Sequence, residues 1–221
     1  MTTINMAEMR AHFFDLDHTL VKGNSSFRFC CYLVRKRALS PLSLIYAIAC
    51  YLRHLWLGGS LVWLHEKIFS RVLRGLSLPF LKQHVSRFVP EYLKKASNPS
   101  IMGYLQEAMA KGEYTVILSN SPGFLVSAFA EFLGVNTWRA TEYATDEEFK
   151  LECIQSVLTG EEKACALKKL SSQLSLKKEQ IVAYSDSFLD LPFLLFAGKV
   201  VVVGPDRQLL RVAQEKGWTI V

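Results

Sequence analysis

Most of the aspartates in this chain follow directly on short apolar segments, and this placement limits the folds that the chain can adopt. The chain has six aspartates, and four of them, Asp15, Asp17, Asp186 and Asp190, lie at the ends of two such segments. Short apolar runs bounded by polar residues are typical of buried strands. A third apolar run ends in the polar residues 119–121. We therefore predict a functional site built at the ends of neighbouring strands.

Strands and helices are predicted to alternate along most of the chain. The predicted strands span residues 11–16, 114–118, 138–143, 148–154, 181–184, 199–203 and 218–221, the third and fourth forming a hairpin. The predicted helices between them span residues 101–111, 123–133, 161–171, 189–196 and 207–216. This alternation indicates a doubly wound, Rossmann-like α/β fold with a parallel sheet. Ligands of such sheets bind beyond the carboxyl ends of the strands, where the aspartates lie.

Residues 24–97 differ from the rest of the chain in pattern and in charge. Their apolar residues recur at helical spacing, and prolines and glycines break the pattern at intervals. This segment has 12 basic and 2 acidic residues, whereas the remainder has 14 and 18, which gives net charges of +10 and −4. We therefore predict an all-helical module over residues 23–97, inserted into a core formed by residues 1–22 and 98–221.

The acidic strand ends predict a bound cation. Asp15 and Asp17 are two residues apart, so both can face one site if the chain leaves the sheet between them, and Asp186 would join them from another strand. Mg²⁺ prefers a few carboxylates, with water and substrate phosphate completing its coordination. Without a cation, these carboxylates would repel one another and any phosphate. Mg²⁺ is therefore the expected cofactor.

Four ordered segments resemble the motifs of the haloacid dehalogenase (HAD) superfamily. Residues 13–20 are similar to its D-x-D-x-T motif, and residues 116–119 to its apolar strand that ends in Ser or Thr. Residues 160–163 are similar to its third motif, a lysine near a helix start, and residues 184–190 to its D-x-x-x-D motif. A large insertion after the first motif resembles the helical-cap branch, which contains phosphoserine phosphatase-like enzymes. The resemblance implies a Mg²⁺-dependent phosphatase that hydrolyses a phosphate monoester.

This resemblance implies catalytic roles for the strand-end acids. Asp15 would attack phosphorus and form an aspartyl-phosphate. Asp17 would donate a proton to the leaving alcohol and then take one from the attacking water. The metal ligands would be Asp15, Asp17 through its backbone carbonyl, and Asp186.

The resemblance also implies residues that bind the phosphoryl group or support the site. Ser119 and Lys163 would bind the phosphoryl oxygens. The expected supporting residues are Thr19, Asn120 and Asp190.

Several of these assignments have competitors in the sequence. Ser119 could instead cap the next helix, and Ser121 competes for its role. Lys168 and Lys169 compete with Lys163, although they fit an exposed helix face. Asp190 could simply favour a helix N-terminus. The resemblance implies no role for His18.

The substrate is left open between a small phosphorylated metabolite and a lipid headgroup phosphate. Phosphoserine phosphatases usually carry a Glu soon after the first motif, but residues 21–28 contain no acid, which argues against phosphoserine. Arg28 is a candidate contact to an anionic group of the substrate. The basic, apolar cap fits either an ordinary helical bundle or a surface that contacts anionic lipids, and it resembles the cap of phosphatidylglycerophosphate phosphatases. Phosphoryl transfer to another alcohol also stays open.

Charge and targeting signals set the remaining expectations. The formal charge of +6 favours anionic partners, but no nucleic-acid-binding motif accompanies it, so no nucleic acid is expected. The first residues do not resemble a secretory signal, and the five cysteines form no C-x-x-C pair. A cytoplasmic protein is therefore expected, with peripheral membrane contact through the cap as an alternative. Residues 39–64 are apolar but are split by Arg53 and His54, which favours buried or interfacial helices.

Overall fold

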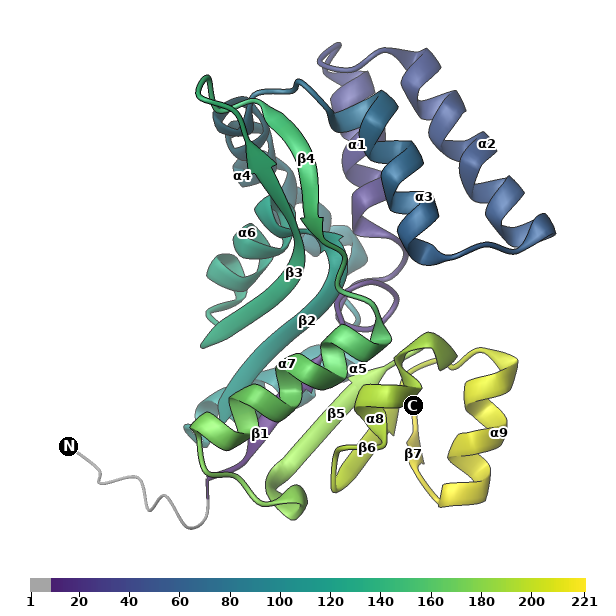
Figure 1. Cartoon of the computed structure of the whole chain (residues 1–221). Coiled ribbons are helices and arrows are strands. Elements are labelled where there is room, and N and C mark those ends of the chain that lie inside the picture. The colour runs from purple at the N-terminus through teal and green to yellow at the C-terminus, as the bar shows by residue number, and fades with distance from the viewer. Residues whose placement is uncertain (1–8) are drawn as a thin grey trace.

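A seven-stranded sheet forms the centre of the computed structural model, which describes residues 9–221 (Figure 1). The strand order is β4-β3-β2-β1-β5-β6-β7, and neighbouring strands are parallel except for β3 and β4. The strands are β1 (Ala11–Phe14), β2 (Tyr114–Pro122), β3 (Thr137–Thr145), β4 (Leu151–Ser156), β5 (Ile181–Ser185), β6 (Lys199–Val202) and β7 (Thr219–Ile220).

Helices connect these strands and cover both faces of the sheet. The α-helices are α1 (Ser25–Arg35), α2 (Pro41–Leu57), α3 (Leu61–Ile68), α4 (Leu78–Ala96), α5 (Pro99–Ala110), α6 (Gly123–Leu133), α7 (Gly160–Gln173), α8 (Leu191–Leu194) and α9 (Arg207–Lys216). The shorter helical segments are the π-helix η1 (Phe69–Leu73) and the 3₁₀ helices η2 (Lys178–Gln180) and η3 (Phe188–Asp190).

Alternating side chains of the central strands form two hydrophobic clusters, one on each face of the sheet. Phe14 and Ile117 belong to one cluster, and their neighbours Phe13 and Val116 belong to the other. Helices α5 and α6 cover the first face, and α7, α8 and α9 cover the second. Strands buried on both faces carry apolar residues at successive positions, which is why these segments read as continuous apolar runs. The predicted doubly wound α/β fold is confirmed.

Strand β2 is longer than the sequence predicted. Residues 119–122, which lie beyond the predicted strand 114–118, continue β2 because Pro122 pairs with Thr141 of β3. The pairing register shifts between Leu118 and Pro122, so the polar residues between them lie in an irregular part of the ladder. Irregular ladders of this kind occur often beside active sites, where they redirect side chains. The predicted hairpin is present as the antiparallel pair β3 and β4.

Helices α1 to α4 lie between β1 and β2 in the sequence, and the chain enters and leaves them at one place. There, Val21 pairs with Ser97 as an antiparallel bridge, and the Lys22 amide donates to the Ala96 carbonyl at 2.6 Å. The Asn98 amide donates to the Leu20 carbonyl at 2.9 Å. The two connections are thus hydrogen-bonded to each other beside the end of β1. Figure 1 shows α1, α2 and α3 grouped to one side of the sheet.

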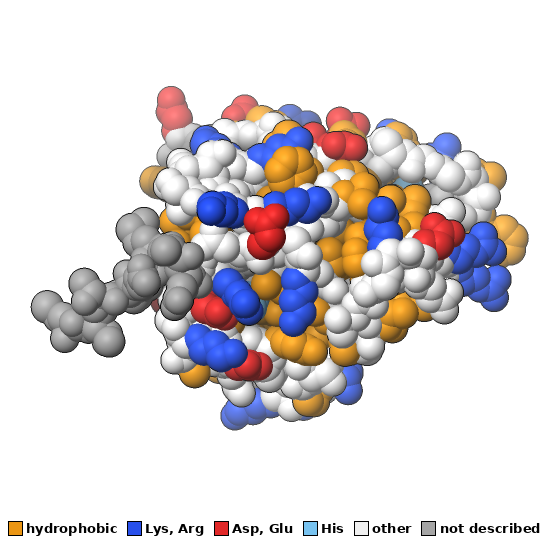
Figure 2. All heavy atoms as spheres, turned by 90° about the horizontal axis from the view of Figure 1, so that it is seen from below, with side chains coloured by type: hydrophobic (Ala, Val, Ile, Leu, Met, Phe, Trp, Pro, Cys, Tyr) orange, Lys and Arg blue, Asp and Glu red, His pale blue; other side chains and the backbone are white. Residues whose placement is uncertain are grey.

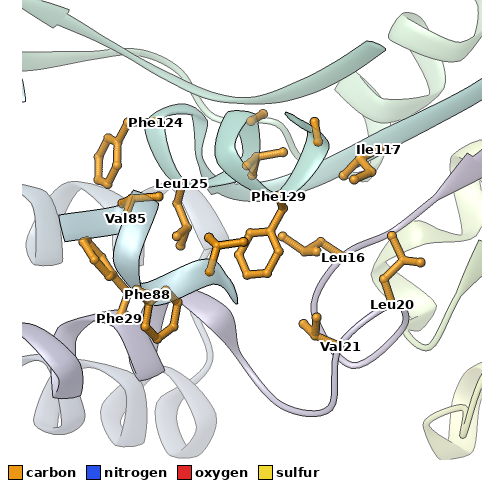
Figure 3. Packing of buried hydrophobic residues seen from close by; sticks show 14 of the residues in the cluster. Leu16, Leu20, Val21, Phe29, Val85, Phe88, Ile117, Phe124, Leu125 and Phe129 are labelled. Carbon is orange, nitrogen blue, oxygen red and sulfur yellow. The ribbon is translucent and has the colours of Figure 1, made fainter. Parts of the chain in front are cut away.

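Helix α4 joins this helical group to the core. Its residues Val85 and Phe88 belong to the same buried cluster as Phe124 of α6 and Phe29 of α1 (Figure 3). The ring centroids of Phe29 and Phe88 are 5.3 Å apart, and those of Phe29 and Phe124 are 6.3 Å apart. Aromatic pairs at such distances stabilise a contact beyond the apolar area that they bury. Within residues 9–221, no helix is both long and apolar enough to cross a membrane.

Candidate active site

The end of β1 places two buried carboxylates close to the centre of the sheet. The Asp15 amide donates to the Tyr184 carbonyl at 3.0 Å, so the ladder between β1 and β5 continues to this residue. Beyond it the chain turns sharply, with His18 at a φ of 60° and the Val21 amide donating to the Leu16 carbonyl. Asp15 is 6% exposed and Asp17 is 8% exposed. The chain therefore leaves the sheet between the two acids, as their spacing required.

Lys163 joins the acids that follow β1 and β5. Its Nζ lies 2.6 Å from Oδ1 of Asp15 and 2.8 Å from Oδ2 of Asp190. The Ser185 hydroxyl donates to the same Asp190 oxygen at 2.6 Å. Lys163 lies in the first turn of α7, which begins with a capping box formed by Thr159 and Glu162. The start of α7 thus fixes the position of the Lys163 ammonium relative to the carboxylates of Asp15 and Asp190.

The competing lysines do not take part in this cluster. Lys168 and Lys169 lie further along α7 and are exposed. The Lys168 ammonium lies over the Phe196 ring, 4.4 Å from its centroid. Lys163, by contrast, is 2% exposed. The structure therefore brings Lys163 to the acids and leaves the other two lysines on the surface.

Burial and mutual repulsion disfavour the charged forms of the clustered acids. Burial raises the pKa of Asp15 well above its usual range, and the nearby Asp190 and Asp186 raise it further against the opposing Lys163 ammonium. Burial also raises the pKa of Asp186 to about 6, although the nearby His18 opposes this shift. For Lys163, burial lowers the pKa, but Asp15 and Asp190 outweigh it and keep the ammonium charged. The carboxylates of Asp15 and Asp190 therefore share a single buried ammonium, and Asp186 lies near enough to feel its charge.

This donor set fits a hard divalent cation. Carboxylate oxygens are the ligands that Mg²⁺ prefers, and a cation would relieve the repulsion between Asp15 and Asp186. In the part of the chain that the structure describes, no three His, Cys, Asp or Glu side chains lie close enough together to hold a metal ion. A cation here would thus take two carboxylates and complete its coordination with backbone carbonyls, water or phosphate. Thr19 lies beside Asp186, with its hydroxyl 3.5 Å from Oδ1.

The carboxylate of Asp17 is held by serines from two other segments. The Ser25 amide, in the first turn of α1, donates to Oδ1 at 2.6 Å. The Ser121 hydroxyl, near the end of β2, donates to Oδ2 at 2.6 Å. The Ser26 hydroxyl lies 2.6 Å from the Ser121 hydroxyl. With a hydrogen bond to each of its two oxygens, the Asp17 side chain is held in one orientation.

Sequence reasoning missed this role of Ser25, Ser26 and Ser121. It considered Ser121 only as a competitor of Ser119 and gave the other two no role. The signal in the sequence is weak, because serine is common at strand ends and in the first turn of helices. Only the approach of α1 to β2 brings Ser25 and Ser121 to the Asp17 carboxylate and Ser26 to Ser121.

Ser119 and Asn120 lie in the irregular end of β2. Ser119 is fully buried, and its hydroxyl accepts from the Ser121 amide at 3.1 Å. The backbone carbonyl of Asn120 accepts from the Thr141 hydroxyl at 2.7 Å. Helix α6 has Pro122 at its N-cap position without a side-chain cap, so Ser119 does not cap it. Ser119 is therefore linked to Asp17 through Ser121, whose amide it accepts from and whose hydroxyl contacts the carboxylate.

Arg28 is exposed on α1, three residues after Ser25, whose amide contacts Asp17. Burial raises the pKa of Tyr92 to about 12, with a smaller contribution from nearby Asp17 and an opposing one from Arg28. The Tyr92 hydroxyl donates to the Lys22 carbonyl at 2.9 Å. Arg28 is thus on the same side of the molecule as Asp17, but no hydrogen bond or ion pair in the described structure joins it to the clustered acids.

Comparison with known proteins gives one family match and several relatives that align with most of this chain. The family model of haloacid dehalogenase-like hydrolases matches residues 12–195. The "Inhibition of morphological differentiation protein" of Streptomyces azureus is 28% identical over 222 residues, which are 96% of this chain and 77% of that protein. Phosphoserine phosphatase SerB1 of Mycobacterium tuberculosis is 26% identical over 214 residues, which are 95% of this chain and 70% of that protein.

A solved structure shares the fold over nearly the whole chain. The crystal structure of a protein of unknown function from Bordetella pertussis Tohama I superposes with a TM-score of 0.84 at 20% identity. The superposition covers 96% of this chain and 98% of that one. At this identity the likeness shows the fold alone. The range matched by the family model contains every strand-end residue of the cluster described above, from Asp15 to Asp190.

Proposed function

Because this chain belongs to the haloacid dehalogenase-like hydrolases and is a phosphomonoesterase, we propose that it hydrolyses its substrate through an aspartyl-phosphate on Asp15. The observation that carries the proposal is the contact of Lys163 with both Asp15 and Asp190 in a buried cluster. A buried ammonium beside a buried carboxylate can neutralise a phosphoryl group that approaches the carboxylate.

The reaction proceeds in two steps on this proposal. A carboxylate oxygen of Asp15 attacks phosphorus, and the bond from phosphorus to the leaving oxygen breaks while Asp17 donates its proton to that oxygen. In the second step Asp17 takes a proton from water, and the resulting nucleophile attacks phosphorus. Phosphate leaves, and the carboxylate of Asp15 is restored. The net change is hydrolysis of one phosphate ester bond by one water.

Asp15, the backbone carbonyl of Asp17, and Asp186 would hold Mg²⁺. When bound, the metal shields the acids from the incoming phosphate and polarises the phosphoryl group. The raised pKa values of Asp15 and Asp186 support this assignment, because a cation offsets the burial and repulsion that raise them. Thr19 lies beside Asp186 and would help to hold it in place.

The remaining residues bind the phosphoryl oxygens or hold their neighbours. Lys163 and the Ser119 hydroxyl would donate hydrogen bonds to the phosphoryl oxygens. Asp190 orients Lys163, and Ser185 in turn holds Asp190. Asn120 supports the turn through its backbone contact with Thr141.

Residues 23–97 would form a cap over this site, with the core made of residues 1–22 and 98–221. The paired connections at Lys22 and Ala96 support this division, because both chain crossings lie at one narrow place. The first turn of α1 also reaches the site directly through the Ser25 amide. Arg28, one turn further along α1, is the proposed contact to an anionic group of the substrate.

The substrate that we propose is a small phosphorylated metabolite other than phosphoserine. The relative SerB1 is named as a phosphoserine phosphatase, but residues 21–28 of this chain have no acid that could bind an ammonium group. A lipid headgroup phosphate is the second candidate, and the exposed apolar face of α2 favours it. Transfer of the phosphoryl group to an alcohol would use the same first step.

Phosphate release from a panel of substrates tests the proposal. The panel should contain p-nitrophenyl phosphate, phosphoserine, small phosphomonoesters and phosphatidylglycerophosphate in detergent, each with Mg²⁺ and with a chelator. We expect release that requires Mg²⁺, falls to background in Asp15→Asn, and persists in Asp146→Asn, which changes an exposed aspartate of the β3–β4 turn. Release that survives in Asp15→Asn, or no release from any substrate by the folded protein, would overturn it.

A further inference from the structure

Helix α2 exposes large apolar side chains along its whole length. Leu42 is 74% exposed and Trp56 is 85% exposed, at opposite ends of the helix. Further exposed apolar residues of α2 are Ile45, Ile48, Tyr51, Leu52, Leu55 and Leu57. Of its 17 residues, Ala47 and Cys50 are the buried ones. A helix at the surface of a monomeric protein usually presents polar side chains to water, so this face requires a partner.

The exposed apolar residues of α2 form one continuous stripe. Residues 42, 45, 49, 52 and 56 recur every three or four positions and are all exposed, so they lie on one face of the helix. Figure 2 shows apolar side chains on the surface of the molecule seen from below. Exposed apolar residues outside α2 include Phe132, Phe149 and Leu189, and scattered ones need no explanation. On α2, by contrast, the exposed apolar side chains follow one another along the whole helix. Figure 1 shows α2 at the outer edge of the helical group, with α1 and α3 between it and the sheet.

The helical segment that carries this apolar stripe is strongly basic. Residues 24–75 hold eight basic residues and one acid, Glu66, which gives a net charge of +7. All eight basic side chains are exposed, and they are Arg28, Arg35, Lys36, Arg37, Arg53, Lys67, Arg71 and Arg74. Within α2 the guanidinium of Arg53 lies over the Trp63 ring of α3, 4.4 Å from its centroid. The apolar stripe therefore belongs to a segment whose exposed charges are almost all positive.

We propose that the outer face of α2 docks on the surface of an anionic lipid bilayer. Leu42, Leu52 and Trp56 would enter the boundary between headgroups and acyl chains, while the basic side chains of α1, α3 and η1 meet anionic headgroups. A second copy of the chain would cover the apolar stripe but would bring two surfaces of charge +7 together. An anionic bilayer matches both the apolar and the basic component. This inference does not depend on the chemistry proposed for Asp15.

Vesicle flotation with the full chain tests the docking. The vesicles should contain phosphatidylcholine alone or phosphatidylcholine mixed with phosphatidylglycerol. We expect the protein to float with the mixed vesicles, to bind phosphatidylcholine vesicles more weakly, and to lose binding as salt is added. A shift of Trp56 emission to shorter wavelength should accompany binding, since this indole is now 85% exposed.

Two kinds of variant separate the apolar from the electrostatic component. Leu52→Glu and Trp56→Glu should abolish flotation, whereas Phe132→Glu, which changes a 55% exposed residue of α6, should bind like the wild type. Replacing Arg35, Lys36 and Arg37 with glutamine should weaken binding to mixed vesicles by roughly fivefold for each charge removed. Because the altered side chains are exposed, the fold should be retained, and circular dichroism checks this.

Three outcomes would overturn the docking. They are no flotation with either vesicle, flotation that Leu52→Glu and Trp56→Glu leave unchanged, and a dimer in sedimentation velocity that the same variants dissociate. The third outcome would assign the face to a second copy. Hydrolysis of p-nitrophenyl phosphate by the same preparations keeps the two proposals apart. Activity without lipid binding contradicts only the docking, and lipid binding without activity contradicts only the proposed reaction.

Discussion

Asp17 takes its position from segments that lie far from it in the sequence. Its two carboxylate oxygens accept from the Ser25 amide and from the Ser121 hydroxyl, both at 2.6 Å. These contacts hold the proposed acid and base at the junction of the β1 loop, α1 and β2. A group that must deliver a proton to one leaving oxygen benefits from such fixed geometry. Ser121 is therefore a positioning residue on this view.

Removing the Ser121 hydroxyl should slow hydrolysis most for substrates whose leaving group must receive a proton from Asp17. Ser121→Ala deletes a hydrogen bond that positions the Asp17 side chain, which is worth about 0.5–1.5 kcal/mol, so the rate should fall on the order of twofold to tenfold. The loss should be larger for an alkyl phosphate than for p-nitrophenyl phosphate, whose leaving group needs no proton. Steady-state kinetics with both substrates measures this difference.

Ser127→Ala provides the matched control for this prediction. The Ser127 hydroxyl, in α6, donates to the Phe124 carbonyl of its own helix at 3.2 Å and lies outside the cluster. This variant should keep wild-type kinetics on both substrates. An equal loss on both substrates in Ser121→Ala would show that the serine acts on the fold and not through Asp17.

At the scale of elements, the start of α7 is pressed closely against η3. A Cβ added at Gly160 would lie 1.9 Å from the Leu189 carbonyl oxygen, so only glycine fits between these two segments. Lys163 lies one turn along α7, and Asp190 ends η3. The close approach therefore sets the distance between the Lys163 ammonium and the Asp190 carboxylate.

Gly160→Ala should separate these two elements. The extra methyl group must displace the backbone near Leu189, and overpacking of this kind costs about 1–3 kcal/mol of the free energy of unfolding. The displacement should also lower phosphatase activity, because it moves Lys163 away from Asp190. Chemical denaturation and steady-state kinetics measure the two effects.

Gly103→Ala is the corresponding control within a helix. Gly103 lies exposed inside α5, and a Cβ there would meet nothing within 4 Å. Alanine is the better helix former, so this variant should be more stable by about 0.5–1 kcal/mol with unchanged activity. Loss of activity in Gly103→Ala, or none in Gly160→Ala, would contradict the role assigned to the α7 start.

The sequence predicted the strand ends better than the contacts between them. Continuous apolar runs before Asp15 and Asp186 indicated buried parallel strands, because such strands are apolar on both faces. The extension of β2 through Ser121 was missed, since it depends on pairing of Pro122 with Thr141 after a register shift. The contact of Ser26 with Ser121 spans 95 residues, and no local pattern encodes it. The sequence thus predicted the edge of the sheet at which the site lies, but not the serine contacts that hold Asp17.

At the scale of the whole molecule, charge is divided unevenly between the inserted helices and the core. Residues 24–97 carry a net charge of +10 and the remainder carries −4. The acids of the core include the buried Asp15 and Asp190, which Lys163 partly neutralises. On the proposed function, the positive charge of residues 24–97 would attract a phosphate monoester to the molecule in spite of the acids of the site. Such fields raise the rate of encounter with anions.

This division of charge predicts a specific dependence on ionic strength. For a dianionic phosphate monoester, kcat/KM should fall as salt is added while kcat changes little, because screening acts on the encounter and not on buried groups. The variant in which Arg35, Lys36 and Arg37 are all glutamine should have a lower kcat/KM at low salt. Its kcat/KM should also fall less than that of the wild type as salt is added. The Lys168→Gln/Lys169→Gln variant removes exposed charges from α7 in the core and should keep a salt dependence closer to that of the wild type. If kcat/KM is independent of salt in all three proteins, the positive charge of the inserted helices does not guide the substrate.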